Sequence, residues 1–186
     1  GVLAEHMAVR QKAGLFDVSH MGELRLKGPD AVANVQKLIT ADISAMQDGD
    51  IKYAMFCNDA GGILDDFIVY RCAADDYWLV VNAGNRDKDA AWVESHLFGD
   101  VDYRDEGDDW GQVALQGPKS GDILKKLCAE QYIPAKYYTF IDNVPLDLGS
   151  RTIHALVSQT GYTGEYGFEL YCRAEDTVDL WHALLA

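Results

Sequence analysis

The chain has 186 residues, of which 48% are hydrophobic, so it can bury one substantial core or two small ones and is not a disordered protein. Its 16 Lys and Arg residues against 30 Asp and Glu residues give a net charge of −14, which disfavours binding to nucleic acid or to an anionic membrane surface. No apolar run approaches the roughly 20 residues that span a bilayer, and no apolar leader opens the chain. We therefore expect a soluble intracellular protein.

The cysteines and histidines give no sign of a metal site. The four cysteines are scattered without a C-x-x-C pair, and the five histidines are isolated from one another. We predict no bound metal, and we expect the cysteines to be packing residues in a reducing compartment.

Both ends of the chain have helical spacing. Glu5–Arg10 reads as the middle of a helix, and Glu175–Leu185 reads as a helix without the glycine or asparagine that usually closes one. We therefore expect a fragment of a longer polypeptide, truncated at both ends.

Between these ends, strand-like and helix-like segments alternate irregularly. In chain order, the patterns predict a strand at 21–27, a helix opened by 28–30, strands at 51–57, 63–71 and 77–82, a helix at 85–98, a strand at 101–104, a strand at 112–116, a helix at 119–129, and strands at 151–158 and 167–172. Neighbouring strands joined by short loops favour antiparallel sheets, and the interspersed helices exclude an all-β sandwich. The predicted fold class is α+β, mainly antiparallel sheets with packed helices. The acidic stretch 105–109 is the most loop-like part of the chain, so we place an internal subdomain boundary near 105–112.

Two adjacent carboxylates, Asp65 and Asp66, stand at the head of a strongly apolar strand. Because side chains alternate along a strand, Asp66 shares one face with Tyr70 while Asp65 lies on the other, and one aspartate must face inward. A buried carboxylate is costly unless it is paired, and it is kept mainly where it contacts a ligand or fixes a loop. The alternative is that one aspartate caps the hairpin loop at 58–62 through backbone N–H groups.

The segment 160–169 combines three glycines, an aromatic residue and a carboxylate in one loop. Gly161 and Gly164 would let the backbone approach a ligand closely, and Glu165 would accept N–H groups of a heterocycle. The alternative is an ordinary hairpin loop with a solvated glutamate. The order G-x-G-x-x-G is missing, which argues against a dinucleotide site.

Several other side chains suit a planar heteroaromatic ligand. Tyr53, Tyr70 and Tyr138 are flat rings with polar tips at strand or strand-edge positions. Asn82 ends a predicted strand and could offer a donor and an acceptor to a ring edge, although an amide there is more often a turn former.

A serine-protease-like triad is rejected. Asp17, Ser19 and His20 lie within four residues, but catalytic triads are assembled from separate elements, and no G-x-S-x-G elbow occurs. We expect His20 to make structural hydrogen bonds.

Five motifs, in matching order and spacing, resemble the aminomethyltransferase family of the glycine cleavage system, the T-proteins. They lie at 13–23, 61–70, 80–83, 116–118 and 160–165. The resemblance implies an aminomethyltransferase-like fold that binds tetrahydrofolate in a central hole. Residues 1–186 would form its incomplete folate-binding region, without the C-terminal β-rich domain.

The resemblance also implies a set of site residues. Carried over position by position, the folate contacts are Met21, Tyr53, Asp66, Tyr70, Asn82, Tyr138 and Glu165. Asp66 would be the catalytic residue, with Asp65 left open as an alternative. Gln159 stands where the family usually has an arginine, which puts the anchoring of its loop in doubt.

The implied reaction transfers a methylene carbon from an aminomethyl group, carried on the lipoyl arm of the H-protein, to tetrahydrofolate as co-substrate, with release of ammonia. A buried aspartate beside the folate nitrogens would act as proton acceptor or counter-charge, without a metal. The expected place is the bacterial cytoplasm, or the mitochondrial matrix in a eukaryote. The alternatives are another folate-dependent demethylase, the folate domain of a dimethylglycine or sarcosine oxidising enzyme, and a non-enzymatic folate-binding iron–sulfur assembly protein.

Overall fold

The computed structural model describes residues 1–186 and divides into two compact units. Unit 1 comprises Gly1–Ser19 and Asp109–Ala186, and unit 2 comprises His20–Asp108, so unit 2 is inserted into the chain of unit 1. The second division lies within the acidic stretch that has the most loop-like composition. The first division, between Ser19 and His20, has no comparable signal in the composition.

Unit 2 is a five-stranded antiparallel sheet with the strand order β3-β4-β5-β2-β6. Its elements are β2 (Gly22–Lys27), α2 (Ala31–Leu38), β3 (Ile51–Cys57), β4 (Ile63–Ala73), β5 (Asp76–Val81), the short 3-10 helix η1 (Ala83–Asn85), α3 (Arg86–Ser95) and β6 (Asp102–Asp105).

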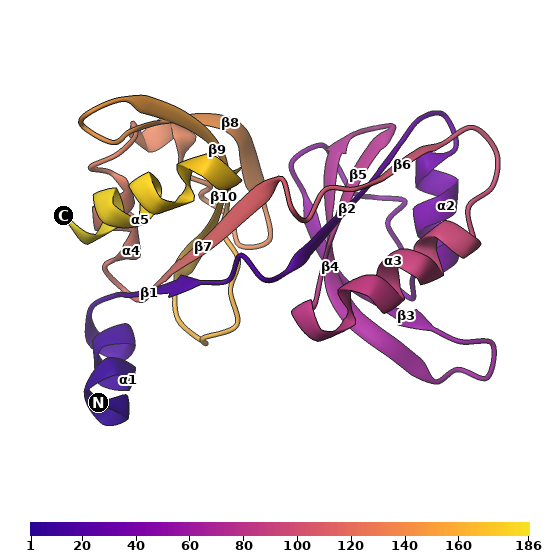
Figure 1. Cartoon of the computed structure of the whole chain (residues 1–186), viewed down its shortest axis with the longest axis horizontal. Coiled ribbons are helices and arrows are strands. Elements are labelled where there is room, and N and C mark those ends of the chain that lie inside the picture. The colour runs from indigo at the N-terminus through magenta and orange to yellow at the C-terminus, as the bar shows by residue number, and fades with distance from the viewer. The chain divides into compact units, whose positions relative to one another are not determined.

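One face of this sheet forms the core of unit 2 with α2 and α3 (Figure 1). Val35 of α2 and Val93 of α3 are fully buried against strand residues such as Leu24 and Val69. Because side chains alternate along each strand, the residues between these core positions lie on the opposite face. That opposite face carries Asp66, Tyr53 and Tyr70.

Unit 1 is a second five-stranded antiparallel sheet, with the order β1-β7-β10-β9-β8. Its elements are α1 (Val2–Gln11), β1 (Gly14–Asp17), β7 (Trp110–Gln116), α4 (Ser120–Leu124), η2 (Glu130–Tyr132), β8 (Phe140–Asp147), β9 (Thr152–Ser158), β10 (Gly167–Arg173), η3 (Ala174–Asp176) and α5 (Thr177–Leu185). Leu124 of α4 and Leu180 of α5 pack into the core on one face of this sheet. Helix α1 has no buried residue.

The predicted α+β class with antiparallel sheets is confirmed, since every strand pairing is antiparallel and the helices pack on the sheets. The helix predicted at 119–129 is wrong in length, because α4 ends at Leu124. The carbonyl of Leu127 accepts a hydrogen bond from Asp147 N of β8 at 2.8 Å, so pairing with the sheet replaces a continued helix.

Two strands were not predicted, and both are edges of the sheet of unit 1. Strand β1 has only four residues, and β8 contains Pro145, which weakens a strand pattern but is tolerated at an edge.

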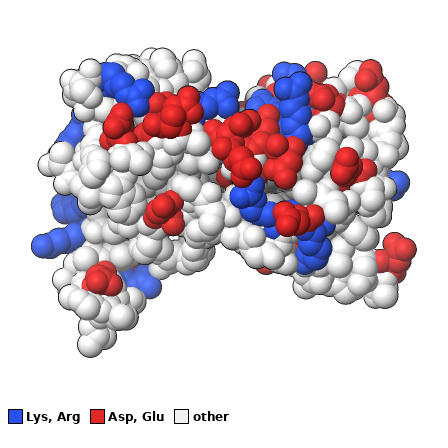
Figure 2. All heavy atoms as spheres, viewed as in Figure 1, with Lys and Arg blue, Asp and Glu red and all other residues white.

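The surface reflects the net charge of −14. Asp and Glu side chains gather in dense groups on the face drawn in Figure 2. None of the helices has the length and apolar composition that crossing a bilayer requires.

Candidate functional site

Five of the seven predicted site residues belong to unit 2, and strand alternation places three of them on one face of its sheet. Tyr53 of β3 is directly opposite Ile68 of β4, so Tyr53 shares a face with Asp66 and Tyr70. This face is opposite to the core that α2 and α3 complete. The prediction that Asp66 and Tyr70 lie on the same side is therefore confirmed.

Tyr53 and Asp66 are joined directly. Tyr53 Oη donates a hydrogen bond to Asp66 Oδ2 at 2.8 Å, and both side chains are exposed. The bond raises the pKa of Tyr53, because the carboxylate holds the phenolic proton. The phenol therefore orients the carboxylate on an accessible surface.

Asn82, at the end of β5, holds the backbone of the neighbouring strand β4 at Asp66. Its Nδ2 donates to the carbonyl oxygen of Asp66 at 2.7 Å and to Asp65 Oδ1 at 3.1 Å. Both hydrogens of this amide are then used, so Asn82 can offer a ligand only its carbonyl oxygen. Gly22 pairs with Val81, and continuing that register places Met21 opposite Asn82.

The inward aspartate is Asp65 and not Asp66. The side chain of Asp65 is 7% exposed, on the face that α3 covers, whereas Asp66 is exposed. The expectation that Asp66 is the buried aspartate is therefore wrong. The reason is that the helices cover the face of Phe67 and Val69, and Asp65 alternates onto that face.

Tyr70 is fully buried although it shares the face of Asp66. Its ring lies edge-on to Trp78 of β5, with the ring centroids 5.7 Å apart. Tyr70 is thus a buried packing residue, while Tyr53, with 48% of its surface exposed, is accessible.

A second acid, Asp89, lies beside Asp65 and was not predicted. Asp89 is on α3 and fully buried, and Asp65 Oδ1 also accepts a bond from Asn85 Nδ2 at 2.8 Å. Burial, together with Asp65, raises the pKa of Asp89 from 3.8 to about 7. Burial alone would raise the pKa of Asp65. Hydrogen bonds from Asp89, Asn82 and Asn85 outweigh this effect, so the net pKa of Asp65 is below its usual value. A signal existed in the sequence, since Asp89 is four residues before Val93 and so on the same side of the helix.

The other two predicted site residues, Tyr138 and Glu165, belong to unit 1. Tyr138 has a left-handed backbone, with φ of 61°, and its N–H donates to the carbonyl of Gln159 at 3.0 Å. Its ring lies edge-on to Tyr137, with the centroids 4.7 Å apart. A positive φ at a bulky residue is uncommon, so the surrounding structure holds this tyrosine in place.

Glu165 lies in the loop between β9 and β10 and is held by α1. Arg10 Nη1 donates to Glu165 Oε1 at 2.9 Å and to the carbonyl of Thr163 at 2.7 Å. Glu165 Oε2 is not part of this ion pair. Arg10 therefore binds one carboxylate oxygen of Glu165, and Oε2 can accept a further hydrogen bond.

The same loop is anchored from β7 by Gln116. Its Nε2 donates to the carbonyls of Thr160 and Phe168 at 3.0 and 3.1 Å, and its Oε1 accepts a bond from Thr163 Oγ1 at 2.9 Å. Gly161, with φ of +144°, is packed so closely against Gln116 that a Cβ would overlap it. Gln116 and Arg10 thus anchor the loop, although Gln159 stands where the family usually has an arginine.

Glu169 of β10 fixes the start of the loop and was not predicted. Its Oε1 accepts a bond from Gln112 Nε2 at 2.9 Å, and its Oε2 accepts a bond from Thr160 Oγ1. Burial raises its pKa. This network is internal and stabilises Thr160.

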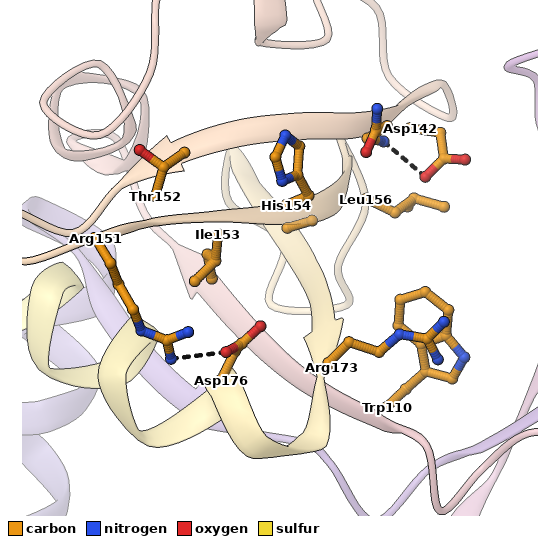
Figure 3. A pocket seen from close by; sticks show the side chains of 11 residues that line it. Trp110, Asp142, Arg151, Thr152, Ile153, His154, Leu156, Arg173 and Asp176 are labelled. Carbon is orange, nitrogen blue, oxygen red and sulfur yellow. Dashed lines mark hydrogen bonds and ion pairs between the residues drawn. The ribbon is translucent and has the colours of Figure 1, made fainter.

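Unit 1 also has two surface hollows. One, of about 730 Å³, lies between α1, β1 and the loop, and includes Arg10 and Thr163. The other, of about 380 Å³, is lined mainly by β9 (Figure 3). In the second hollow Arg151 is paired with Asp176 at 2.7 Å and Arg173 lies over the ring of Trp110 at 4.8 Å. None of the predicted site residues lines either hollow.

The remaining predictions concern residues without a ligand role. Ser19 Oγ accepts a bond from Gln112 N at 3.0 Å, and Asp17 Oδ1 accepts one from Ser19 N at 3.0 Å, so these two side chains support the backbone. All four cysteines are free thiols. No group of three or more His, Cys, Asp or Glu side chains among residues 1–186 is arranged to hold a metal ion.

Comparison with known proteins identifies close relatives. Residues 1–186 match the family described as GCVT N-terminal domain. An aminomethyltransferase from Anoxybacillus flavithermus is 49% identical over 181 residues, which are 97% of this chain and 49% of the relative. An aminomethyltransferase from Clostridium botulinum is 46% identical over 186 residues, covering 100% of this chain and 49% of the relative. The chain thus spans about half the length of the curated relatives it matches.

Two solved structures resemble the fold. The glycine cleavage system aminomethyltransferase T from Bartonella henselae has a TM-score of 0.87 at 32% identity, covering 100% of this chain and 49% of that one. A heterotetrameric sarcosine oxidase from a Corynebacterium species has a TM-score of 0.68 at 19% identity, covering 98% of this chain and 88% of that one, which shows likeness of fold alone.

Proposed function

The chain belongs to the GCVT N-terminal domain family, and from that premise we propose that the full-length protein is an aminomethyltransferase of the glycine cleavage system. It takes the methylene carbon of an aminomethyl group on the lipoyl arm of an H-protein, transfers it to tetrahydrofolate and releases ammonia. Relatives named aminomethyltransferase at 49% and 46% identity support this proposal. Because the relatives are bacterial, the proposal places the reaction in a bacterial cytoplasm.

The observation that carries the proposal is the accessible Tyr53–Asp66 pair. A folate nitrogen that attacks the aminomethyl carbon must lose a proton, and the carbon that loses ammonia passes through a cationic state. Asp66, already oriented by the phenol at 2.8 Å, would accept that proton or stabilise that charge. An exposed carboxylate can do this only once substrates exclude water around it.

The other proposed folate contacts differ in what they can offer. Asn82 contributes its carbonyl oxygen, because its amide hydrogens are used. Glu165 contributes Oε2, because Oε1 is paired with Arg10. Each of these is an acceptor, which suits an N–H group of a reduced pteridine ring, and the half-buried Met21 contributes apolar surface. Tyr70 is fully buried against Trp78, so it would support the strand that carries Asp66 from within the sheet.

The test uses the full-length protein and the variant Asp66→Asn. Tetrahydrofolate binding is measured by calorimetry, and turnover is measured with lipoylated, aminomethylated H-protein. Loss of one general base lowers the rate by about 10²- to 10⁴-fold, so we expect kcat to fall by that range while folate still binds.

Asp59→Asn is the matched control, because Asp59 is an exposed aspartate in the turn before β4. It should leave turnover unchanged. Near-normal turnover of Asp66→Asn would overturn the assignment of the catalytic residue. Turnover of a methylated amine such as sarcosine, in place of the H-protein substrate, would favour the folate-dependent demethylase reading and overturn the proposed substrate.

A further inference from the structure

Asp65 and Asp89 form a buried acid pair behind the proposed folate site. Asp65 is on β4 with 7% of its surface exposed, and Asp89 is on α3 with none exposed. Asp65 Oδ2 and both carboxylate oxygens of Asp89 are buried and accept no hydrogen bond from a backbone or side-chain N–H group. Two ionised carboxylates at this position would be two buried anions facing each other.

No buried cation compensates the pair. The groups that face it are Asn82 and Asn85, which are neutral, and Lys88 on the same helix as Asp89. Lys88 is exposed, and its Nζ donates to the carbonyl of Leu64 at 2.6 Å. Because each carboxylate disfavours ionisation of the other in a shared buried site, the pair retains one proton at a pH where isolated aspartates have lost theirs.

The surroundings decide which acid carries that proton. Asp65 accepts two amide hydrogen bonds, which favour its ionised form, whereas Asp89 has no such donors. The opposite directions of their pKa shifts agree with this assignment. The proton therefore lies on Asp89 and is donated to the carboxylate of Asp65.

We propose that Asp65 and Asp89 share one buried proton and that this acid pair positions Asn82. Asn82 in turn bonds the carbonyl of Asp66 at 2.7 Å, so the pair connects α3 to the strand that presents the proposed catalytic carboxylate. Asp89 is then a positioning residue that acts through Asp65 and Asn82, and this inference rests on the proposed function.

The pair also makes the site sensitive to pH. When the shared proton is lost, two negative charges face each other between β4 and α3, and their repulsion loosens the anchor of Asn82. We expect tetrahydrofolate to bind more weakly above neutral pH than below it. By linkage, the proton and folate strengthen each other's binding.

The test compares Asp89→Asn with the wild type in the full-length protein. Asparagine keeps a donor toward Asp65 but cannot lose its proton in this pH range. For the wild type, the Kd of tetrahydrofolate should rise by about fivefold between pH 6 and pH 8.5, a coupling of ordinary size. For Asp89→Asn, the Kd should stay constant over this range and near the low-pH wild-type value.

Asp87→Asn is the matched control, because Asp87 is an exposed aspartate on the same helix. It should keep the wild-type pH profile. Asp89→Leu, which removes the donor, should weaken folate binding at every pH. An Asp89→Asn protein that keeps the wild-type pH dependence would overturn the inference.

A titration of the carboxyl carbons by NMR, without any ligand, separates this inference from the proposed function. A carboxyl group that titrates near neutral pH in the wild type and disappears in Asp89→Asn supports the shared proton. Its absence from the wild type overturns the shared proton even if folate binds. Failure of folate to bind at any pH would overturn the proposed function, and the titration would still decide the protonation of the pair.

Discussion

Glu23 provides a sensitive test of the charge state behind the proposed site. It lies on β2 and is 1% exposed, on the face of the sheet that carries Asp66, and its Oε2 has no hydrogen-bond partner. Burial raises its pKa from 4.5 to about 8, against the opposing effect of Arg86. We therefore expect Glu23 to be mostly protonated at neutral pH in the folded protein.

The sign and size of the effect on stability follow from linkage. Between pH 4.5 and pH 8 the unfolded chain has lost this proton and the folded chain keeps it, so the free energy of unfolding falls as pH rises. The slope is about 1.4 kcal/mol per pH unit, and the 3.5 units between 4.5 and 8 give a limit of about 5 kcal/mol. About 2–3 kcal/mol of this lies between pH 6 and pH 9.

The variant Glu23→Gln removes the ionisation and keeps the shape. We expect its stability relative to the wild type to increase by about 2–3 kcal/mol on going from pH 6 to pH 9. Guanidinium unfolding of the full-length protein at several pH values measures this, and hydrogen exchange of the β2 amides reports on unit 2 alone.

Asp59→Asn is the control, since Asp59 is an exposed aspartate of unit 2 and is not among the charges that act on Glu23. Its stability should follow the wild type at every pH. Parallel pH curves for Glu23→Gln and the wild type would instead mean that Glu23 is ionised in the folded protein.

Two further predictions concern the groups that orient the proposed site. Tyr53→Phe removes one hydrogen bond to Asp66, so kcat should fall by about fivefold with little change in the KM for folate, as steady-state kinetics would show; an unchanged kcat would contradict an orienting role. Arg10→Met removes an exposed ion pair that contributes about 0.5 kcal/mol to stability, so the Tm should barely change. Calorimetry should nevertheless show weaker folate binding, by about threefold to tenfold, with Lys12→Met as the unchanged control; equal affinities of the two variants would rule out α1 as an anchor of the loop.

Short-range patterns of residues were enough to predict the local geometry around the site. Strand alternation placed Asp66 and Tyr70 on one face. Asn58, Gly61 and Gly62 indicated the hairpin loop that leads into β4. These features depend on residues close together in the chain, whose backbone preferences act over a few residues. Such patterns can be read without knowing what the strand packs against.

Which face of a strand is buried depends on packing between distant segments. Asp65 is the inward acid because α3 covers its side of the sheet, and the same packing brings Asp89 from 24 residues away into a shared proton site. Likewise, Arg10 meets Glu165 across 155 residues of sequence, and the edge strands β1 and β8 form by pairing with distant segments. Periodicity shows which residues share a face of a strand. The burial and the pKa of each residue depend on the segment that packs against that face, and the packing of the whole unit determines which segment this is.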